Sequence, residues 1–248
     1  MALFKRNKKK LYSNSMKHGV GLITVTKPTS SIAEQFRTIR TNIQFSSADK
    51  QLNSILFTSA EPSEGKSTVS SNVAVTWADQ GNKVLLIDAD LRRPTVSRSF
   101  RVDNQHGLTT ILTSKQADLS ESIKRTKVTN LYVLPSGPVP PNPSELLNSV
   151  KMDQLLNVLN DQFDMIIVDV PPVNTVTDAQ VLAAKVDGVI LVVPQGIALK
   201  GTVLHARDLL NKVHANLLGT IMNRVTAAES GGYYGGYYGG YYGTDDKK

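Results

Sequence analysis

Residues 55–68 have the sequence ILFTSAEPSEGKST, and this stretch decides the fold. An apolar, strand-like run leads into a loop of small residues that ends in GKST at positions 65–68. Apolar side chains then recur every four residues, at Val69, Val73 and Trp77, which predicts a helix. A strand, a loop and a helix in this order are typical of a phosphate-binding P-loop.

The chemistry of such a loop predicts a magnesium–nucleotide site. Backbone N–H groups of the loop and the first helical turn bind phosphate oxygens, Lys66 reaches the terminal phosphates, and Ser67 ligates Mg²⁺. The usual pattern opens with glycine where this chain has Ala60, so close backbone approach requires that Ala60 keep a negative φ. The expected nucleotide-binding residues of the loop are Ala60, Glu61, Ser63, Glu64, Gly65, Lys66, Ser67 and Thr68.

Apolar runs alternate with helical patterns along most of the chain. The expected strands are 54–59, 83–88, 131–134, 165–169, 188–193 and 218–223. The expected helices lie near 31–45, 67–80, 151–161, 177–186 and 200–213. Continuous apolar strands separated by helices predict an α/β fold, with a doubly wound, mostly parallel sheet covered on both faces. In such sheets ligands bind at the carboxyl ends of the strands.

Three carboxylates follow two of these strands. Asp88 and Asp90 come at the end of one apolar run, and Asp169 ends another. A single aspartate after a strand is commonly a helix N-cap. Two such strand ends beside a P-loop instead indicate hard oxygen ligands for Mg²⁺ and a carboxylate for proton transfer, so Ser67, Asp88 and Asp169 are the expected metal-binding residues.

The last expected strand ends in Asn223 and Arg224 at the same edge of the sheet. Asn223 can bind the edge of a nucleotide base and Arg224 can stack on that base. A turn role for Asn223 is the alternative. Both residues are therefore further candidates for ATP binding.

Composition narrows the function classes. The chain of 248 residues has no cysteine, which excludes disulfides and thiolate zinc sites, and its four histidines form no close-spaced ligand motif. No apolar run approaches the roughly 18 residues of a membrane-spanning helix, and no export signal is indicated, so we expect a cytoplasmic protein.

The basic residues are concentrated near the N-terminus. Six of the 28 lie within residues 5–17 without an acidic residue among them, which leaves 22 basic against 21 acidic residues elsewhere. Such a segment suggests contact with anionic lipid, and a merely solubilising tail is the alternative. No basic and aromatic stripe indicates nucleic acid, so no nucleic-acid partner is expected.

The C-terminal residues 231–243 repeat the unit Gly-Gly-Tyr-Tyr. The repeat holds six of the eight tyrosines: Tyr233, Tyr234, Tyr237, Tyr238, Tyr241 and Tyr242. Paired glycines disfavour a helix, so we expect an exposed run of phenols. Such a tail can stack on sugars or single-stranded nucleic acid. Beside a nucleotide site it is more typical of a phosphorylation substrate.

Six features together resemble the bacterial tyrosine kinases (BY-kinases) of capsule and exopolysaccharide assembly. They are the loop 60–67, the aspartate motif 86–94, the strand end 166–169, the proline-rich 136–147, the spacing Glu34-x-x-Arg37-x-x-Arg40 and the tyrosine cluster. The resemblance implies a P-loop NTPase fold and an autokinase that uses ATP and Mg²⁺. The implied domains are a flexible arm 1–20, a kinase domain 21–228 and a tyrosine tail 229–248.

The resemblance also implies roles and partners. Lys66 would bind the β- and γ-phosphates, Asp169 would help to hold Mg²⁺, and Asp88 or Asp90 would accept the phenol proton. Residues 34–40 would form a subunit contact in a ring, where an intrahelical salt bridge is the alternative. A transmembrane adaptor would activate the kinase at the inner face of the plasma membrane, and a phosphatase would reset the tail.

Two other functions compete with the kinase. One is an ATPase switch of the chromosome-partitioning or division-site type, but those proteins carry a signature lysine where this chain has Glu61. The other is a non-catalytic regulator of polysaccharide chain length that binds ATP only as a conformational switch.

Overall fold

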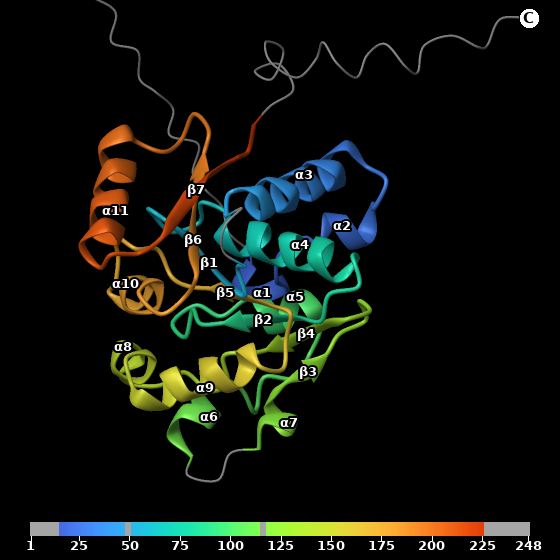
Figure 1. Ribbon diagram of the computed structural model, residues 1–248, viewed down its shortest axis with the longest axis vertical. Helices are drawn as coiled ribbons and strands as arrows, with labels where there is room; N and C mark the ends of the chain where they lie inside the picture. Colours follow the sequence, from blue (N-terminus) through green and yellow to red (C-terminus); the bar gives the residue numbers. More distant parts are fainter. Residues whose placement is uncertain (1–14, 48–50, 115–117, 226–248) are drawn as a thin grey trace, which may run out of the picture.

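A seven-stranded sheet forms the centre of the molecule, in the order β3-β4-β2-β5-β1-β6-β7 (Figure 1). The computed structural model describes residues 15–47, 51–114 and 118–225. Neighbouring strands run parallel, except that β3 is antiparallel to β4. The strands are β1 (Ser54–Ser59), β2 (Val84–Asp88), β3 (Lys124–Arg125), β4 (Leu131–Leu134), β5 (Met165–Asp169), β6 (Gly188–Pro194) and β7 (Leu217–Asn223).

Helices cover both faces of this sheet (Figure 1). The helices are α1 (Ser15–His18), α2 (Ile23–Thr26), α3 (Ser31–Phe45), α4 (Lys66–Ala78), α5 (Val96–Phe100), α6 (Leu108–Thr113), α7 (Leu119–Ser122), α8 (Pro143–Leu147), α9 (Val150–Asn160), α10 (Asp178–Ala183) and α11 (Lys200–Lys212). Helices α3, α4 and α5 pack on one face, and α6, α8, α9, α10 and α11 pack on the other.

The central strands β1, β2, β5 and β6 are almost entirely buried, which explains their mostly apolar sequences, whereas the edge strands β3 and β7 are largely accessible. In β1, Ile55 and Phe57 pack against the α3–α4 side, whereas Leu56 between them packs against the α9 side. All six residues of β1 are buried. This alternation creates two apolar cores and fixes the register of the sheet, because a slip by one residue would exchange the faces.

Local signals set the ends of the longer helices. Ser30 accepts a hydrogen bond from the backbone N–H of Ala33 and caps α3, and Ser149 caps α9 through Met152. The apolar stripe of α3 is buried at Phe36 and Ile43.

The expected elements are all present, within a few residues of their predicted ends. The largest difference is α10, predicted over 177–186, which ends at Ala183. The prediction did not include β3 or the short helices α1, α2 and α5–α8. Segments of two to six residues are too short to show a helical or alternating period.

The expectation of an irregular arm over 1–20 does not hold for residues 15–20. They form α1 and a turn in which Gly19 has a φ of +75° and the backbone N–H of Val20 donates to Ser99 Oγ at 2.8 Å. A Cβ on Gly19 would lie 2.4 Å from the Ser99 backbone nitrogen, so this contact requires glycine. The segment therefore packs against α5.

Several predictions fall outside the described residues, namely those on residues 1–14 and on the tyrosine tail 229–248. In the parts of the chain that the structure describes, every helix is too short or too polar to cross a bilayer.

Candidate nucleotide site

The P-loop joins β1 to α4 in a conformation that depends on two left-handed residues. Ser63 has a φ of +66° and Gly65, which precedes the first turn of α4, has a φ of +100°. Ala60 keeps a negative φ and is fully buried, so alanine is tolerated at the position of the usual first glycine. The buried Glu64 carboxylate accepts a hydrogen bond from the Glu61 backbone N–H at 3.0 Å and closes the loop.

Asn223 and Arg224 bind this loop from the end of β7. Asn223 Nδ2 donates to the Glu64 carbonyl at 2.9 Å, and Arg224 Nη2 donates to the Ser63 carbonyl at 3.0 Å. The sequence suggested that these side chains contact the base. In the structure they hold the backbone of the loop, and contact with a base stays a prediction.

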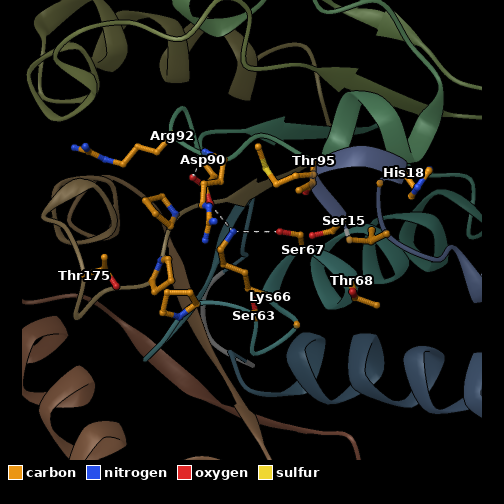
Figure 2. Close-up of a pocket in the computed structure, with 18 of the residues that line it drawn as sticks. Ser15, His18, Ser63, Lys66, Ser67, Thr68, Asp90, Arg92, Thr95 and Thr175 are labelled. Atoms are coloured by element: carbon orange, nitrogen blue, oxygen red, sulfur yellow. Dashed lines mark hydrogen bonds and ion pairs between the residues drawn. The ribbon is translucent and has the colours of Figure 1, made fainter. Parts of the chain in front are cut away.

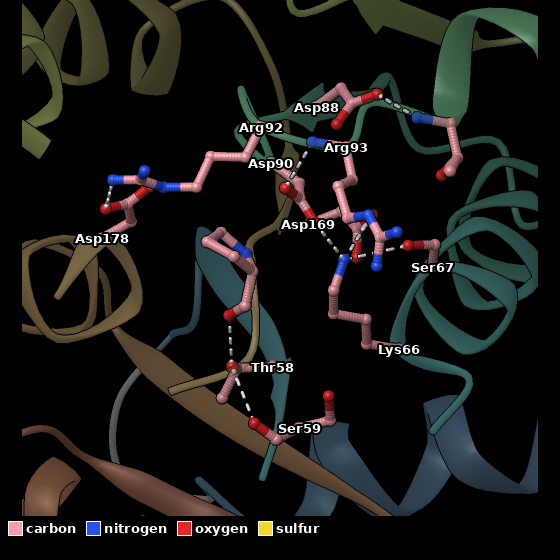
Figure 3. A network of polar contacts seen from close by, with 12 residues as sticks. Thr58, Ser59, Lys66, Ser67, Asp88, Asp90, Arg92, Arg93, Asp169 and Asp178 are labelled. Carbon is pink, nitrogen blue, oxygen red and sulfur yellow. Dashed lines mark hydrogen bonds and ion pairs between the residues drawn. The ribbon is translucent and has the colours of Figure 1, made fainter. Parts of the chain in front are cut away.

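Lys66 lies among three acidic side chains, as the sequence predicted (Figure 3). Its Nζ is 2.8 Å from Asp90 Oδ2, 3.1 Å from Ser67 Oγ and 3.7 Å from Asp169 Oδ2. Burial alone would lower the pKa of Lys66, but the carboxylates of Asp169 and Asp90 outweigh burial and raise it. The ammonium is therefore charged at every physiological pH.

Asp88 occupies the end of β2, directly opposite Asp169 on β5. Its Oδ2 accepts hydrogen bonds from the backbone N–H groups of Thr95 and Val96 at 3.0 and 2.9 Å, so it caps the start of α5. Both carboxyl groups are fully buried. Burial, together with the charge of Asp169, raises the pKa of Asp88 to about 8.

Oxygen atoms at this point of the sheet fit a magnesium ion. Among the described residues, Asp88 Oδ1 and both carboxylate oxygens of Asp169 are buried without a hydrogen-bond partner. Burial raises the pKa of Asp169 although Lys66 opposes this effect. A cation would relieve both the missing partners and the repulsion between the two acids.

The protein alone does not supply a complete cage for a metal. No group of three or more histidine, cysteine, aspartate or glutamate side chains within the described ranges is arranged to hold an ion. This agrees with Mg²⁺ sites that use one hydroxyl, one or two carboxylates, water and phosphate oxygens. Ser67, Asp88 and Asp169 would hold the ion, in part through water.

A pocket of about 780 Å³ opens above these residues (Figure 2). The P-loop, the loop after β2, the segment after β5 and Arg224 line it, and residues 15–20 form a further wall. Asp90 lines the pocket, whereas Asp88 and Asp169 lie beneath it. No pattern in the sequence indicated the N-terminal wall, because this wall depends on the contact of Val20 with α5.

A second polar cluster was missed by sequence reasoning. Arg92 donates to the fully buried Asp178 from Nε at 3.0 Å and from Nη2 at 3.1 Å. The Ser144 hydroxyl, from the proline-rich segment, donates to the same carboxylate at 2.5 Å. The cluster ties the loop after β2 to α10 and α8. Arg92 and Ser144 lie in motifs that the sequence analysis names, but Asp178 does not, and no spacing along the chain shows that the three side chains meet.

The residues of the expected subunit contact lie on α3. Arg37 Nη1 binds Glu34 Oε2 at 2.7 Å, which confirms the intrahelical salt bridge. Arg40 turns inward and donates from Nη1 to the Thr76 carbonyl of α4 at 2.7 Å. The inter-subunit contact stays a prediction.

Comparisons with known proteins agree with this geometry. Residues 53–219 match a family described as an AAA domain. Tyrosine-protein kinase YwqD of Bacillus subtilis is 45% identical over 215 residues, which cover 86% of this chain and 90% of the relative. Putative tyrosine-protein kinase CapB of Staphylococcus aureus is 44% identical over 208 residues, with coverages of 84% and 91%.

A solved structure supports the same assignment. The crystal structure of the chimerical protein CapA2B2 is 39% identical with a TM-score of 0.79, and the match covers 84% of this chain and 93% of that one. Given these matches and the P-loop with its three acidic residues, the chain belongs to the bacterial tyrosine-protein kinases.

Proposed function

We propose that this protein is an ATP- and Mg²⁺-dependent protein-tyrosine kinase that phosphorylates its own terminal tyrosine cluster. The observation that carries the proposal is the placement of Lys66, Ser67 and three acidic side chains at one sheet edge, in a chain whose relatives are named tyrosine kinases. Phosphoryl transfer needs positioned phosphates and stabilised charge, and this edge supplies both.

The proposed transfer uses residues of this chain in separate roles. Lys66 leaves Asp90 to bind the β- and γ-phosphates, while loop N–H groups hold the nucleotide. Bound Mg²⁺ supplies further positive charge at the phosphates. The bond between the γ-phosphorus and the ADP oxygen breaks, a bond to the phenol oxygen forms, and the phenol proton passes to a carboxylate.

Asp90 is better placed than Asp88 to accept this proton. Asp90 lines the pocket, and its Oδ2 becomes free when Lys66 turns to the phosphates. Asp88 lies beneath the pocket and is held by Thr95 and Val96. Asp88 is therefore assigned to the magnesium ion together with Asp169.

The tail is the proposed substrate. Arg224, next to the last described residue, lines the pocket, so the described part of the chain ends at the sheet edge that carries Lys66. A coil of 18 residues, from Arg224 to Tyr242, spans roughly 20–25 Å, so transfer within one chain and transfer between chains are both within reach. Resemblance to the family favours transfer between subunits of a ring, with Glu34, Arg37 and Arg40 at the subunit contact.

The proposed setting is capsule or exopolysaccharide synthesis. The name CapB and the CapA2B2 chimera support a capsule-related kinase with an adaptor. We propose that a transmembrane adaptor activates this chain at the inner face of the plasma membrane and that a phosphotyrosine phosphatase reverses the modification. The basic residues 5–10 would add contact with anionic lipid.

Mass spectrometry of the C-terminal peptide after incubation with Mg-ATP tests the proposal. The full chain is used with and without the cytoplasmic tail of its adaptor, and Lys66→Met is the control. Phosphate on residues 233–242 in the wild type, and none in the variant, is the expected result. ATP consumption without phosphotyrosine would overturn the proposal in favour of an ATPase switch, and nucleotide binding without turnover would favour the chain-length regulator.

A further inference from the structure

Two consecutive arginines after Asp90 point in different directions (Figure 3). Arg92 extends away from Lys66 to the buried Asp178, which receives hydrogen bonds from its Nε and Nη2. Arg92 Nη2 also donates to Ser144 Oγ at 3.2 Å. Three of the five N–H donors of this guanidinium are therefore used by the fold.

The backbone of Arg93 is fixed by a hydrogen bond, whereas its side chain is exposed to the pocket. Its backbone N–H donates to Asp90 Oδ1 at 3.0 Å, which fixes the residue beside the proposed base. Its exposed side chain lines the nucleotide pocket, and it forms no hydrogen bond or ion pair with any residue that the structure describes. Figure 3 shows the guanidinium turned toward Lys66 and Ser67.

Among the described residues that line the pocket, Arg93 is a cation whose side chain has neither an anion nor a hydrogen-bond acceptor, whereas Arg224 donates to the Ser63 carbonyl. Asp90 already neutralises Lys66, and Asp178 neutralises Arg92. A guanidinium is planar, permanently charged and rich in donors, which suits the oxygens of a phosphoryl group. The group expected on this side of Lys66 is the terminal phosphate of the bound nucleotide.

We infer that Arg93 is a further catalytic residue that donates hydrogen bonds to the γ-phosphoryl oxygens of bound ATP. During transfer it stabilises the charge on that group from within the same chain, as arginines do in other phosphoryl-transfer enzymes. The catalytic part of this inference rests on the proposed kinase function. The contact itself requires only that the pocket bind ATP.

A contact with the γ-phosphate predicts a loss confined to ATP. Charge-assisted hydrogen bonds of this kind change affinity by roughly 10- to 100-fold. Arg93→Gln should therefore weaken binding of a non-hydrolysable Mg-ATP analogue by about that factor and leave Mg-ADP binding unchanged. Arg93→Lys, which keeps the charge without the planar donors, should give an intermediate loss.

Isothermal titration calorimetry of the full chain with both nucleotides tests the inference. Arg207→Gln on α11 is the matched control, since it removes one exposed arginine outside the pocket. Unchanged ratios of ATP-analogue to ADP affinity in both Arg93 variants would overturn the inference, and so would equal losses for the two nucleotides.

This outcome is separate from that of the kinase test. If the chain transfers no phosphate to tyrosine but Arg93→Gln still loses its preference for the ATP analogue, the proposed function fails and the γ-phosphate contact stands. If tyrosine transfer occurs and the preference is unchanged, Arg93 has no such contact.

Discussion

Replacing Asp88 by asparagine should make the protein more stable at alkaline pH and abolish much of its pH dependence. In the folded protein the pKa of Asp88 is raised to about 8, first by burial and then by the charge of Asp169. In the unfolded chain an aspartate has a pKa of roughly 3.9. The folded state therefore binds a proton that the unfolded state has lost between these two values.

The sign and size of the effect follow from this difference. A raised folded-state pKa contributes stability that is fully present below about pH 4 and is lost as pH rises through about 8. Each pH unit in this window changes the free energy of unfolding by about 1.36 kcal/mol. Between pH 5 and pH 8 the wild type should lose up to about 4 kcal/mol that Asp88→Asn retains. The neutral amide also removes the repulsion between residue 88 and the Asp169 carboxylate.

Urea unfolding without Mg²⁺, followed by circular dichroism at pH 5 and at pH 8, measures this difference. Asp161→Asn, at an exposed position after α9, is the control and should follow the wild type. Saturating Mg-ADP should flatten the pH dependence of the wild type, because a cation favours the charged carboxylate. Parallel curves for wild type and Asp88→Asn would refute the reasoning, since they would mean that Asp88 is ionised throughout.

Three further predictions concern the loop, the α3 motif and the tail. Asn223→Ala should weaken binding of both adenine and guanine nucleotides by roughly 2- to 10-fold in a fluorescence titration, because it removes one hydrogen bond to the loop. A loss confined to adenine nucleotides would show that Asn223 contacts the base instead. Arg40→Ala should lower the free energy of unfolding by about 1 kcal/mol, because it removes the hydrogen bond to the Thr76 carbonyl. Glu34→Ala removes one partner of an exposed ion pair and should lower it by less than about 0.5 kcal/mol, so equal urea midpoints for the two variants would contradict this reasoning. If the motif joins subunits, light scattering should show smaller assemblies for both variants. Full phosphorylation of residues 233–242 adds roughly −9 to −12 charges and exceeds the net charge of +7, so the phosphorylated chain should have a lower mass in solution than a six-fold Tyr→Phe variant, and equal masses would count against dissociation by charge.

The central sheet was predictable because its buried strands have mostly apolar sequences. A strand covered on both faces is mostly apolar and lacks the alternation of a half-exposed strand, so an aspartate that ends such a run is expected at the carboxyl edge of the sheet. Asp88 and Asp169 were placed at that edge from this pattern alone, and they pair directly across β2 and β5.

The contacts between side chains were not predictable in the same way. They depend on the spatial order of the strands, which places β5 between β2 and β1 although it follows both in the chain. Two ion pairs illustrate this point: Lys66 with Asp90, and Arg92 with Asp178. Each joins two elements, and nothing in their separation along the chain predicts that they meet. Short helices such as α1 form because tertiary contacts hold them and not because of their own sequence.

The P-loop shows how these two kinds of information combine. Glycine is needed at Gly65 for two independent reasons: its φ is +100°, and a Cβ there would lie 2.1 Å from Asn223 Nδ2. The first reason is local and the loop pattern reflects it, whereas the second depends on the amide that β7 brings to the loop. At Ala60 neither demand exists, because φ is negative and the residue packs in the core. The departure from the usual pattern at Ala60 is therefore compatible with a working phosphate loop, and the glycine that the geometry requires is the one that the sequence retains.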